Sequence, residues 1–188
     1  MPTAVYPGSF NPPTVAHLEI SRAVRTHFGI DHVVWAISEV ALGKEQVNKP
    51  RFHDRVAVLE RVASDYEWLQ IEVTDRQLLA DIALGYDVLV MGADKWHQIQ
   101  DPAFYHDDPN LRDKAIMALP RLAIAPRAPF RTPPDQALPV PANLDSISST
   151  EARGGATSMM LEPARQFDEL TGAWSDPDRY EAWLIHQN

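Results

Sequence analysis

The stretch from Tyr6 to His17 constrains the fold of this chain more than any other part of the sequence. It reads Tyr-Pro-Gly-Ser-Phe-Asn-Pro-Pro-Thr-Val-Ala-His and follows a short run, Thr3 to Tyr6, that predicts a β-strand. Gly8 is expected to take a backbone conformation closed to other residues, and Pro12-Pro13 fixes the chain before an apolar-periodic helix. The stretch therefore predicts a strand, a tight corner and a helix in immediate succession.

The predicted helix offers a place for an anion at its beginning, because the first turn of a helix has unpaired N–H groups and the positive end of a dipole. Its inward positions are Val15, Leu18, Ala23 and Val24. Thr14 and His17 are three residues apart and share one face of the first turn. A hydroxyl and an imidazole are therefore expected to face a bound phosphate. The alternative is an ordinary strand-to-helix turn with a surface histidine.

A second segment of similar character lies far down the chain, from Ser146 to Arg153. Ser148 and Glu151 have the spacing of a capping box, which predicts the start of another helix. Ser149 and Thr150 then fall in its opening turn, and Arg153 reaches the same anion with a planar, permanently charged fork. The alternative is an ordinary N-cap followed by a solvated arginine.

Together the two segments resemble the nucleotidyltransferase superfamily related to class I aminoacyl-tRNA synthetases. The paired signatures of that superfamily are similar to G-x-F-[DN]-P-x-[HT]-x-G-H and I-S-S-T-x-x-R, and the matching residues here are Gly8–His17 and Ile147–Arg153. The resemblance covers residues 3–153. It implies transfer of a nucleotidyl group from ATP to a small phosphorylated acceptor, with release of pyrophosphate and with Mg²⁺ shielding the β- and γ-phosphates.

Two branches of the superfamily share features with this chain. The opening Tyr-Pro-Gly-Ser-Phe with Thr14 looks like pantetheine-phosphate adenylyltransferase, whereas Ile147–Arg153, Met91–Trp96 and the chain length look more like nicotinate or nicotinamide mononucleotide adenylyltransferase. The second branch, which acts in NAD biosynthesis, is therefore the favoured function. Phosphopantetheine is the next acceptor, and a cytidylyl donor is a weaker alternative. A class I synthetase is disfavoured, since the chain is short and has no lysine-rich second signature.

The resemblance assigns roles to individual residues. It implies a catalytic group of Thr14, His17, Lys44 and Arg153. Lys44 is preferred over Lys49 as the basic residue after the second strand, with a surface lysine as an equal alternative. It also implies a nucleotide-binding group of Gly8, Ser9, Phe10, Gly92, Asp94, Ser148, Ser149 and Thr150.

Gly92 and Asp94 follow an apolar run, where a small residue permits close approach of a nucleotide and a carboxylate can accept ribose hydroxyl protons. The alternative is a strand-to-helix turn with Asp94 as its N-cap. Trp96 has the size and polarity either to stack on a base or to belong to the core. His106-Asp107-Asp108 are neighbours in a proline-flanked loop and are not expected to converge on one ion, so no protein metal site is predicted.

Three residues depart from the family pattern. Asn11 stands where aspartate is more usual, Ala16 replaces a glycine near the expected nucleotide, and Gly154-Gly155 weakens the helix that should hold Arg153. These departures raise an alternative from a different functional class, a catalytically weak protein that only binds nucleotide.

Strand-like and helix-like patterns alternate along the chain. After the first strand and helix, strands are predicted at His32–Ile37, Trp68–Val73, Asp87–Met91 and Arg121–Ala125, and helices at Arg51–Ala63 and Arg76–Leu84. This alternation predicts an α/β fold, a single domain with a Rossmann-like parallel sheet, right-handed crossovers and helices on both faces.

Residues 1–155 are expected to form the Rossmann-like unit. Six prolines between residues 126 and 145 predict a surface connector, in which Arg127 or Arg131 either reaches the phosphates or is solvated. Residues 156–188 are expected to be a C-terminal extension of the same domain, with little regular structure before a packing helix at Pro177–His186.

Composition narrows the class of protein. With a net charge of −9, a general basic surface for nucleic acid is not expected, and an acidic protein that binds polyphosphate must concentrate its few cations at the site. The chain has no cysteine and no signal-peptide pattern, and its apolar runs are too short to cross a bilayer. A cytoplasmic enzyme is expected, with no membrane partner and with homo-oligomerisation left open.

Overall fold

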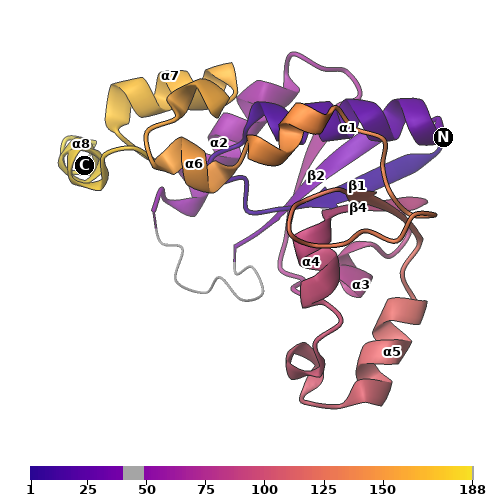
Figure 1. Cartoon of the computed structure of the whole chain (residues 1–188). Coiled ribbons are helices and arrows are strands. Elements are labelled where there is room, and N and C mark those ends of the chain that lie inside the picture. The colour runs from indigo at the N-terminus through magenta and orange to yellow at the C-terminus, as the bar shows by residue number, and fades with distance from the viewer. Residues whose placement is uncertain (40–48, 188) are drawn as a thin grey trace.

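The computed structural model of the chain describes residues 1–39 and 49–187, and in this part of the chain a five-stranded parallel sheet lies between two layers of helices (Figure 1). The strand order is β3-β2-β1-β4-β5. The strands are β1 (Thr3–Pro7), β2 (His32–Ser38), β3 (Leu69–Thr74), β4 (Val88–Gly92) and β5 (Arg121–Ala125). The strand order changes direction between β1 and β4, and ligands of such sheets bind at that point, beyond the carboxyl ends of the strands.

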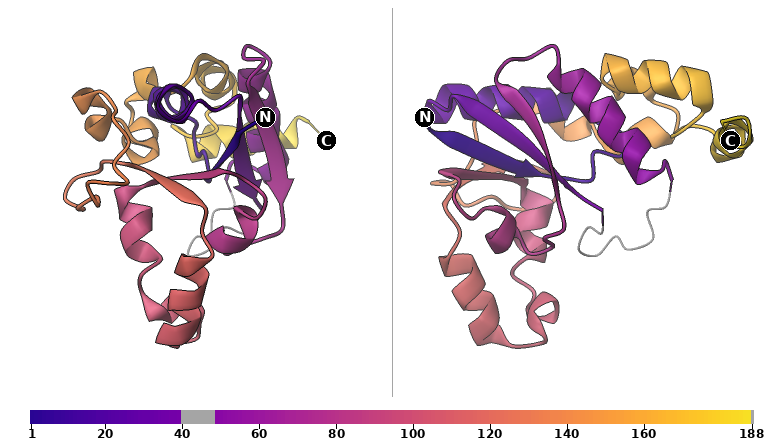
Figure 2. Two further views of the ribbon diagram at one scale, coloured as in Figure 1. Left: turned by 90° about the vertical axis from the view of Figure 1, so that its right-hand side faces the viewer. Right: turned by 180° about the vertical axis from the view of Figure 1, so that it is seen from behind.

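Helices cover both faces of the sheet, as Figure 2 shows from two sides. The layer above the sheet in Figure 1 contains α1 (Val15–Phe28) and α2 (Phe52–Ala63). The opposite side contains α3 (Leu79–Ile82), α4 (Ala93–Gln98) and the projecting α5 (Pro109–Met117). The chain ends with α6 (Ser149–Arg153), α7 (Glu162–Thr171) and α8 (Pro177–Ile185), and α7 packs beside α2. The described residues also form the short 3-10 helices η1 (Pro102–Tyr105), η2 (Ala142–Ser146) and η3 (Thr157–Met159). The predicted Rossmann-like α/β fold is therefore confirmed.

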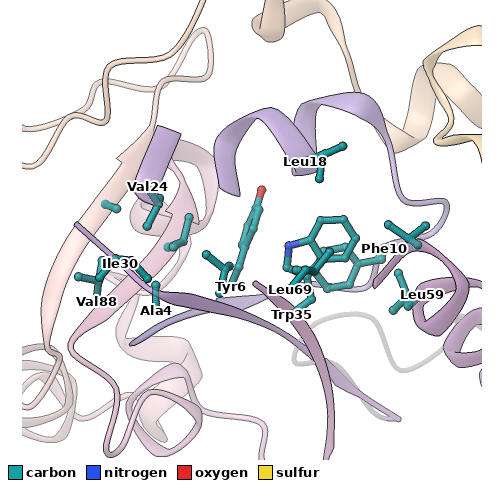
Figure 3. Packing of buried hydrophobic residues seen from close by; sticks show 14 of the residues in the cluster. Ala4, Tyr6, Phe10, Leu18, Val24, Ile30, Trp35, Leu59, Leu69 and Val88 are labelled. Carbon is teal, nitrogen blue, oxygen red and sulfur yellow. The ribbon is translucent and has the colours of Figure 1, made fainter. Parts of the chain in front are cut away.

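The core has two layers because successive side chains of a strand point to opposite faces. Ala4 and Tyr6 of β1 pack under α1 and α2, whereas Val5 between them packs against α3 and α4. In the first layer Phe10 stacks on the buried Trp35, with 4.7 Å between ring centroids, and Tyr6 lies beside them (Figure 3). Both faces of the central strands are covered, which explains why these strands read as continuous apolar runs.

The C-terminal segment forms a third apolar cluster against α2. Trp174 and Tyr180 are buried there with Val58 of α2, and Phe167 and Trp183 pack around them. The predicted packing helix is confirmed as α8. The boundary between residues 155 and 156 stays a prediction, but the extension packs directly on the Rossmann-like unit.

The sequence predicted little regular structure between residue 156 and the packing helix. This prediction was wrong, because helix α7 lies in that segment. Its buried face carries Asp168 and Thr171 beside Ala164, so the apolar spacing that reveals a helix is broken by polar residues. Pro163 in the first turn and Gly172, which ends the helix in a left-handed conformation (φ 75°), are the signals that were available.

Two further expectations were inaccurate. The helix predicted over residues 76–84 is only the single turn of α3. The proline-rich segment is not simply a surface connector, because Leu138 and Leu144 are buried and Leu138 N–H donates to the Ile124 carbonyl at 2.9 Å. The segment thus packs along the β5 edge of the sheet. No helix in the described part of the chain has the length and apolar character needed to cross a bilayer.

Candidate active site

A cavity of about 320 Å³ lies beyond the carboxyl ends of β1 and β4. Each predicted site residue within the described ranges lines it, and these are Gly8, Ser9, Phe10, Thr14, His17, Gly92, Asp94, Ser148, Ser149, Thr150 and Arg153. Lys44 lies outside the described residues. Lys49 pairs with Glu181 of α8 and is not part of the cavity wall. A larger hollow of about 820 Å³ lies beside edge strand β3, but none of the motif residues line it.

The first corner follows β1 and begins with Gly8, whose N–H donates to the Ala36 carbonyl at 3.0 Å. Gly8 was expected to need an unusual backbone conformation, and this was wrong. The left-handed residue is Phe10 (φ 42°), and a Cβ at position 8 would lie 3.0 Å from the Phe10 ring, so a larger residue there would require this ring to shift. Arg55, which is 3% exposed, donates to the Ser9 carbonyl at 3.1 Å, and burial lowers the pKa of its guanidinium.

Thr14 and His17 are bonded to each other at the start of α1. Thr14 is the N-cap rather than a residue of the first turn, and it is fully buried. Its backbone N–H donates to Nδ1 of His17 at 3.0 Å, and its hydroxyl lies 2.8 Å from the same nitrogen. Because Nδ1 accepts, a neutral His17 carries its proton on Nε2, which makes Nε2 the donor of the ring.

Strand β2 holds this turn of α1 in place through a buried hydrogen-bond chain. The Trp35 indole N–H donates to the Ser21 hydroxyl at 2.8 Å, and that hydroxyl donates to the His17 carbonyl at 2.8 Å. The two bonds explain a serine on the buried face of α1 and fix the height of His17 above the sheet.

The second corner has the predicted helix start. The Ser148 hydroxyl accepts from the Glu151 N–H at 3.0 Å, so Ser148 is confirmed as the N-cap of α6. Arg153 donates to the Thr150 hydroxyl at 3.3 Å. Helix α6 ends at Arg153, with Gly154 as its C-cap and Gly155 left-handed (φ 111°), so the two glycines terminate the helix after Arg153 rather than weaken it before that residue.

The two corners are joined directly as well as facing one cavity. Arg153 donates to the Asn11 carbonyl, and the Ser149 hydroxyl donates to the Pro12 carbonyl at 2.8 Å. The next carbonyl, of Pro13, accepts from the Leu161 N–H at 3.1 Å. Three successive carbonyls of the first corner are therefore held by the chain that follows β5.

The third wall of the cavity is the junction of β4 and α4. Gly92 is the last residue of β4 and the N-cap of α4, so the alternative that Asp94 caps this helix is wrong. A Cβ on Gly92 would lie 2.4 Å from Oδ1 of Asp94, so a larger residue would displace that carboxylate. Trp96 is half-buried in the apolar cluster against α3 and α4 and does not line the cavity, which favours the core alternative.

Positive charge gathers at the cavity although the protein is acidic overall. Among the described lining residues the cations are Lys95, Arg127 and Arg153, and the one carboxylate is Asp94. Burial, followed by the charge of Asp94, raises the pKa of Tyr6 far above its ordinary value, so this phenol stays neutral. The predicted concentration of cations is thus found at this site. Arg131 lies elsewhere, with its carbonyl 3.0 Å from Nε2 of His97.

The structure also places Ala16, which departs from the family pattern, and the loop at residues 106–108, which was considered as a metal site. Ala16 is nearly buried and lines the cavity, so its methyl group narrows the space. Asp108 caps α5 by accepting from the Asn110 N–H at 2.8 Å, while His106 and Asp107 take left-handed conformations. No group of three or more metal-ligating side chains occurs within residues 1–39 and 49–187.

Sequence reasoning did not select Tyr6, Lys95 or Tyr105 for the site, although all three line the cavity. Lys95 follows Asp94 directly, so its position after β4 was the available signal. Tyr105 lies in η1, in a loop that has no apolar periodicity, and the sequence held no pattern that could place it there.

The sequence comparisons agree with the two motifs. A phosphopantetheine adenylyltransferase from Rubrobacter xylanophilus is 38% identical over 96 residues, which are 49% of this chain and 54% of that protein. A probable nicotinate-nucleotide adenylyltransferase from Salinibacter ruber is 38% identical over 61 residues, which are 32% of this chain and 31% of that protein. The matched segments thus span about half or less of the length of these curated relatives.

A solved structure shares the fold across most of the chain. It is the nicotinic acid mononucleotide adenylyltransferase of Plasmodium falciparum in complex with NaAD, with a TM-score of 0.65 at 14% identity over 92% of this chain and 96% of that one. A family model of cytidylyltransferase-like proteins matches residues 5–155, which include both corners. The chain therefore belongs to the cytidylyltransferase-like family.

Proposed function

We propose that this protein is an adenylyltransferase that transfers the adenylyl group of ATP to a small phosphorylated acceptor. The observation that carries the proposal is the meeting of the two motif corners, with His17 and Arg153 lining one cavity and the corners bonded to each other. The excess of cations at the cavity of an acidic protein supports a polyanionic substrate.

The reaction is an in-line displacement at the α-phosphorus of ATP. An acceptor phosphate oxygen forms the new bond to the α-phosphorus, and the bond from that phosphorus to the oxygen bridging to the β-phosphate breaks, with the electron pair leaving on pyrophosphate. The attacking phosphate is already ionised, so no general base is needed. Catalysis then consists of positioning and of stabilising charge on the phosphorus oxygens and on pyrophosphate.

The proposed residue roles are those that the family resemblance implies, and the meeting of the two corners at one cavity supports them. Nε2 of His17 donates to phosphate oxygens of the nucleotide, and Thr14 lies near the reacting phosphates. Arg153 and residues 148–150 hold the β- and γ-phosphates. Lys44 is proposed as an additional cation. Mg²⁺ enters as part of the substrate, bound to phosphate oxygens, which suits a cavity wall with a single carboxylate among its described residues.

Asp94 and the Gly92 backbone are proposed to bind the ribose of the nucleotide. A carboxylate after the switch-point strand is well placed to accept hydroxyl protons. We propose a cytoplasmic enzyme whose substrates are small molecules rather than nucleic acid.

We favour nicotinate or nicotinamide mononucleotide as the acceptor. The Salinibacter relative and the Plasmodium structure, both named for this activity, support this choice. The Rubrobacter relative, which matches over a longer stretch, supports phosphopantetheine as the alternative.

A pyrophosphate-release assay with Mg²⁺, ATP or CTP and a panel of phosphorylated acceptors tests the proposal. The panel contains nicotinate mononucleotide, nicotinamide mononucleotide and 4′-phosphopantetheine. We expect release with ATP and one of the mononucleotides, with the dinucleotide as second product. Measurable ATP binding without release from any acceptor would instead show a protein that only binds nucleotide.

A further inference from the structure

The first corner makes one contact that the motif residues do not explain. Asn11 is 6% exposed, and its side-chain oxygen accepts a hydrogen bond of 2.6 Å from the indole N–H of Trp174. An indole nitrogen only donates, so this contact fixes which end of the Asn11 amide faces it. Trp174 lies in the loop between α7 and α8, outside the residues that the family model matches.

The loop that carries Trp174 is itself held firmly. The carboxylate of Asp168, which is 3% exposed, accepts from the Trp174 N–H at 2.7 Å and from the Ser175 N–H at 2.9 Å. The Ser175 hydroxyl donates to the same carboxylate at 2.7 Å. A buried carboxylate with three donors is a rigid anchor, because leaving any donor unpaired there is costly. The unexpected polar face of α7 thus serves to hold the indole.

The position of Asn11 makes this anchor relevant to the site. Asn11 lies between Phe10 and Thr14, both of which line the cavity, and its own carbonyl accepts from Arg153. A shift of Asn11 therefore moves the Thr14–His17 pair on one side and releases the guanidinium of Arg153 on the other.

We infer that Trp174 is a positioning residue, which acts through Asn11 to hold the corner at residues 10–14 in the geometry needed for phosphate transfer. This inference rests on the proposed function. It also gives the Asn11 side chain a structural role, since its oxygen is the acceptor of the indole N–H.

The variant Trp174→Phe removes the N–H and keeps an aromatic ring in the cluster. Turnover is expected to fall about 10- to 100-fold, with the KM for ATP changed less than about threefold, since misplaced reacting groups lower the rate more than the affinity. Trp183→Phe is the matched control in the same cluster and should keep wild-type turnover. In an Asn11→Ala background, Trp174→Phe should have no further effect, because the acceptor is already gone.

Amide hydrogen exchange of a peptide covering residues 9–20 supplies a readout that does not need activity. Exchange should be about tenfold faster in Trp174→Phe than in the wild type or in Trp183→Phe, as expected for the loss of one buried hydrogen bond. Wild-type turnover and exchange in Trp174→Phe, or an equal loss in the Asn11→Ala background, would overturn the inference. A wild-type protein without pyrophosphate release refutes the proposed function, and the exchange result then still decides the role of Trp174.

Discussion

At the scale of single residues, the Thr14 amide decides which nitrogen of His17 carries the proton. It donates to Nδ1 at 3.0 Å, so a neutral imidazole offers N–H at Nε2. The Trp35–Ser21 chain fixes the backbone of the same residue. The ring is therefore oriented before any substrate binds, which is the condition under which a single donor contributes most to a transition state.

Replacement of His17 by alanine tests this orientation. The loss of one preorganised donor costs roughly 2–4 kcal/mol in the transition state, so turnover should fall about 30- to 1000-fold with only a modest change in the Kd for ATP. Steady-state kinetics and calorimetry measure the two quantities. His27→Ala, at the exposed far end of α1, is the control and should behave as the wild type. Near-full turnover in His17→Ala would remove this residue from the mechanism.

Tyr6 gives the protein a defined response to alkaline pH. Burial raises the pKa of Tyr6 above its value of about 10 in the unfolded chain. Above pH 10 the unfolded chain therefore loses a proton that the folded protein keeps, and the free energy of unfolding should fall with rising pH, by about 1.4 kcal/mol per pH unit for each such group.

Urea unfolding between pH 9 and 11 measures this slope. The free energy of unfolding of Tyr6→Phe should fall less steeply with pH than that of the wild type. The difference in slope should be about 1.4 kcal/mol per pH unit, which corresponds to one proton. Tyr66→Phe, in the loop between α2 and β3, serves as the control. Equal slopes in Tyr6→Phe and in the wild type would show that the phenol does not titrate as the buried environment requires.

At the scale of elements, helix α8 is tied to the start of α2 by one hydroxyl. Tyr180 donates to the carboxylate of Asp54, and the Arg51 N–H donates to the Tyr180 hydroxyl at 2.9 Å. Asp54 is 8% exposed, so water could not fully replace the hydrogen bond from Tyr180 if that donor were removed.

The variant Tyr180→Phe should lower the free energy of unfolding by about 1–3 kcal/mol, because a buried carboxylate loses a donor and a backbone N–H loses its acceptor. Equilibrium urea unfolding measures the change, again with Tyr66→Phe as the comparison. If the two variants unfold at the same urea concentration, the α8–α2 link contributes nothing to stability.

Regular elements were predictable from the sequence where one physical signal dominated. The central strands were found because buried parallel strands read as apolar runs, whereas the edge strand β3 alternates apolar residues with Gln70 and Glu72. The first corner was found through its glycine and prolines, and the second through its hydroxyl residues and the spacing of a helix N-cap. Helix α7 was not found because Asp168 and Thr171 occupy its buried face, and α5 was not found because it has no buried residue at all. Periodicity is informative only for helices that bury an apolar stripe.

The candidate site shows the same division. The described motif residues that were predicted from the sequence all line the cavity. The residues after β1 and β4 meet there because the carboxyl ends of parallel strands share one edge of the sheet, whereas Ser148–Arg153 follow η2 and are held there by bonds to the first corner. The contacts of Trp174 with Asn11 and of Arg55 with Ser9 were not predictable, since they join distant segments and depend on tertiary packing alone. The motif residues of the cavity wall were therefore predictable from the sequence, whereas the residues that support them were not.

At the scale of the whole molecule, the chain that follows β5 holds the first corner in place at the cavity. The carbonyls of residues 11–13 are bonded to Arg153, Ser149 and Leu161, and the Asn11 amide is bonded to Trp174. The last part of the chain thus closes around the first corner at the switch point of the sheet. This arrangement predicts that one polyphosphate touches residues from both ends of the sequence.

A crystal structure of the protein with Mg²⁺ and α,β-methylene ATP tests that claim most directly, because the analogue cannot release pyrophosphate. The account predicts the triphosphate in the cavity of about 320 Å³, with Nε2 of His17 at the α-phosphate and Arg153 at the β- and γ-phosphates. A triphosphate bound elsewhere, or one that contacts only one of the two corners, would contradict it.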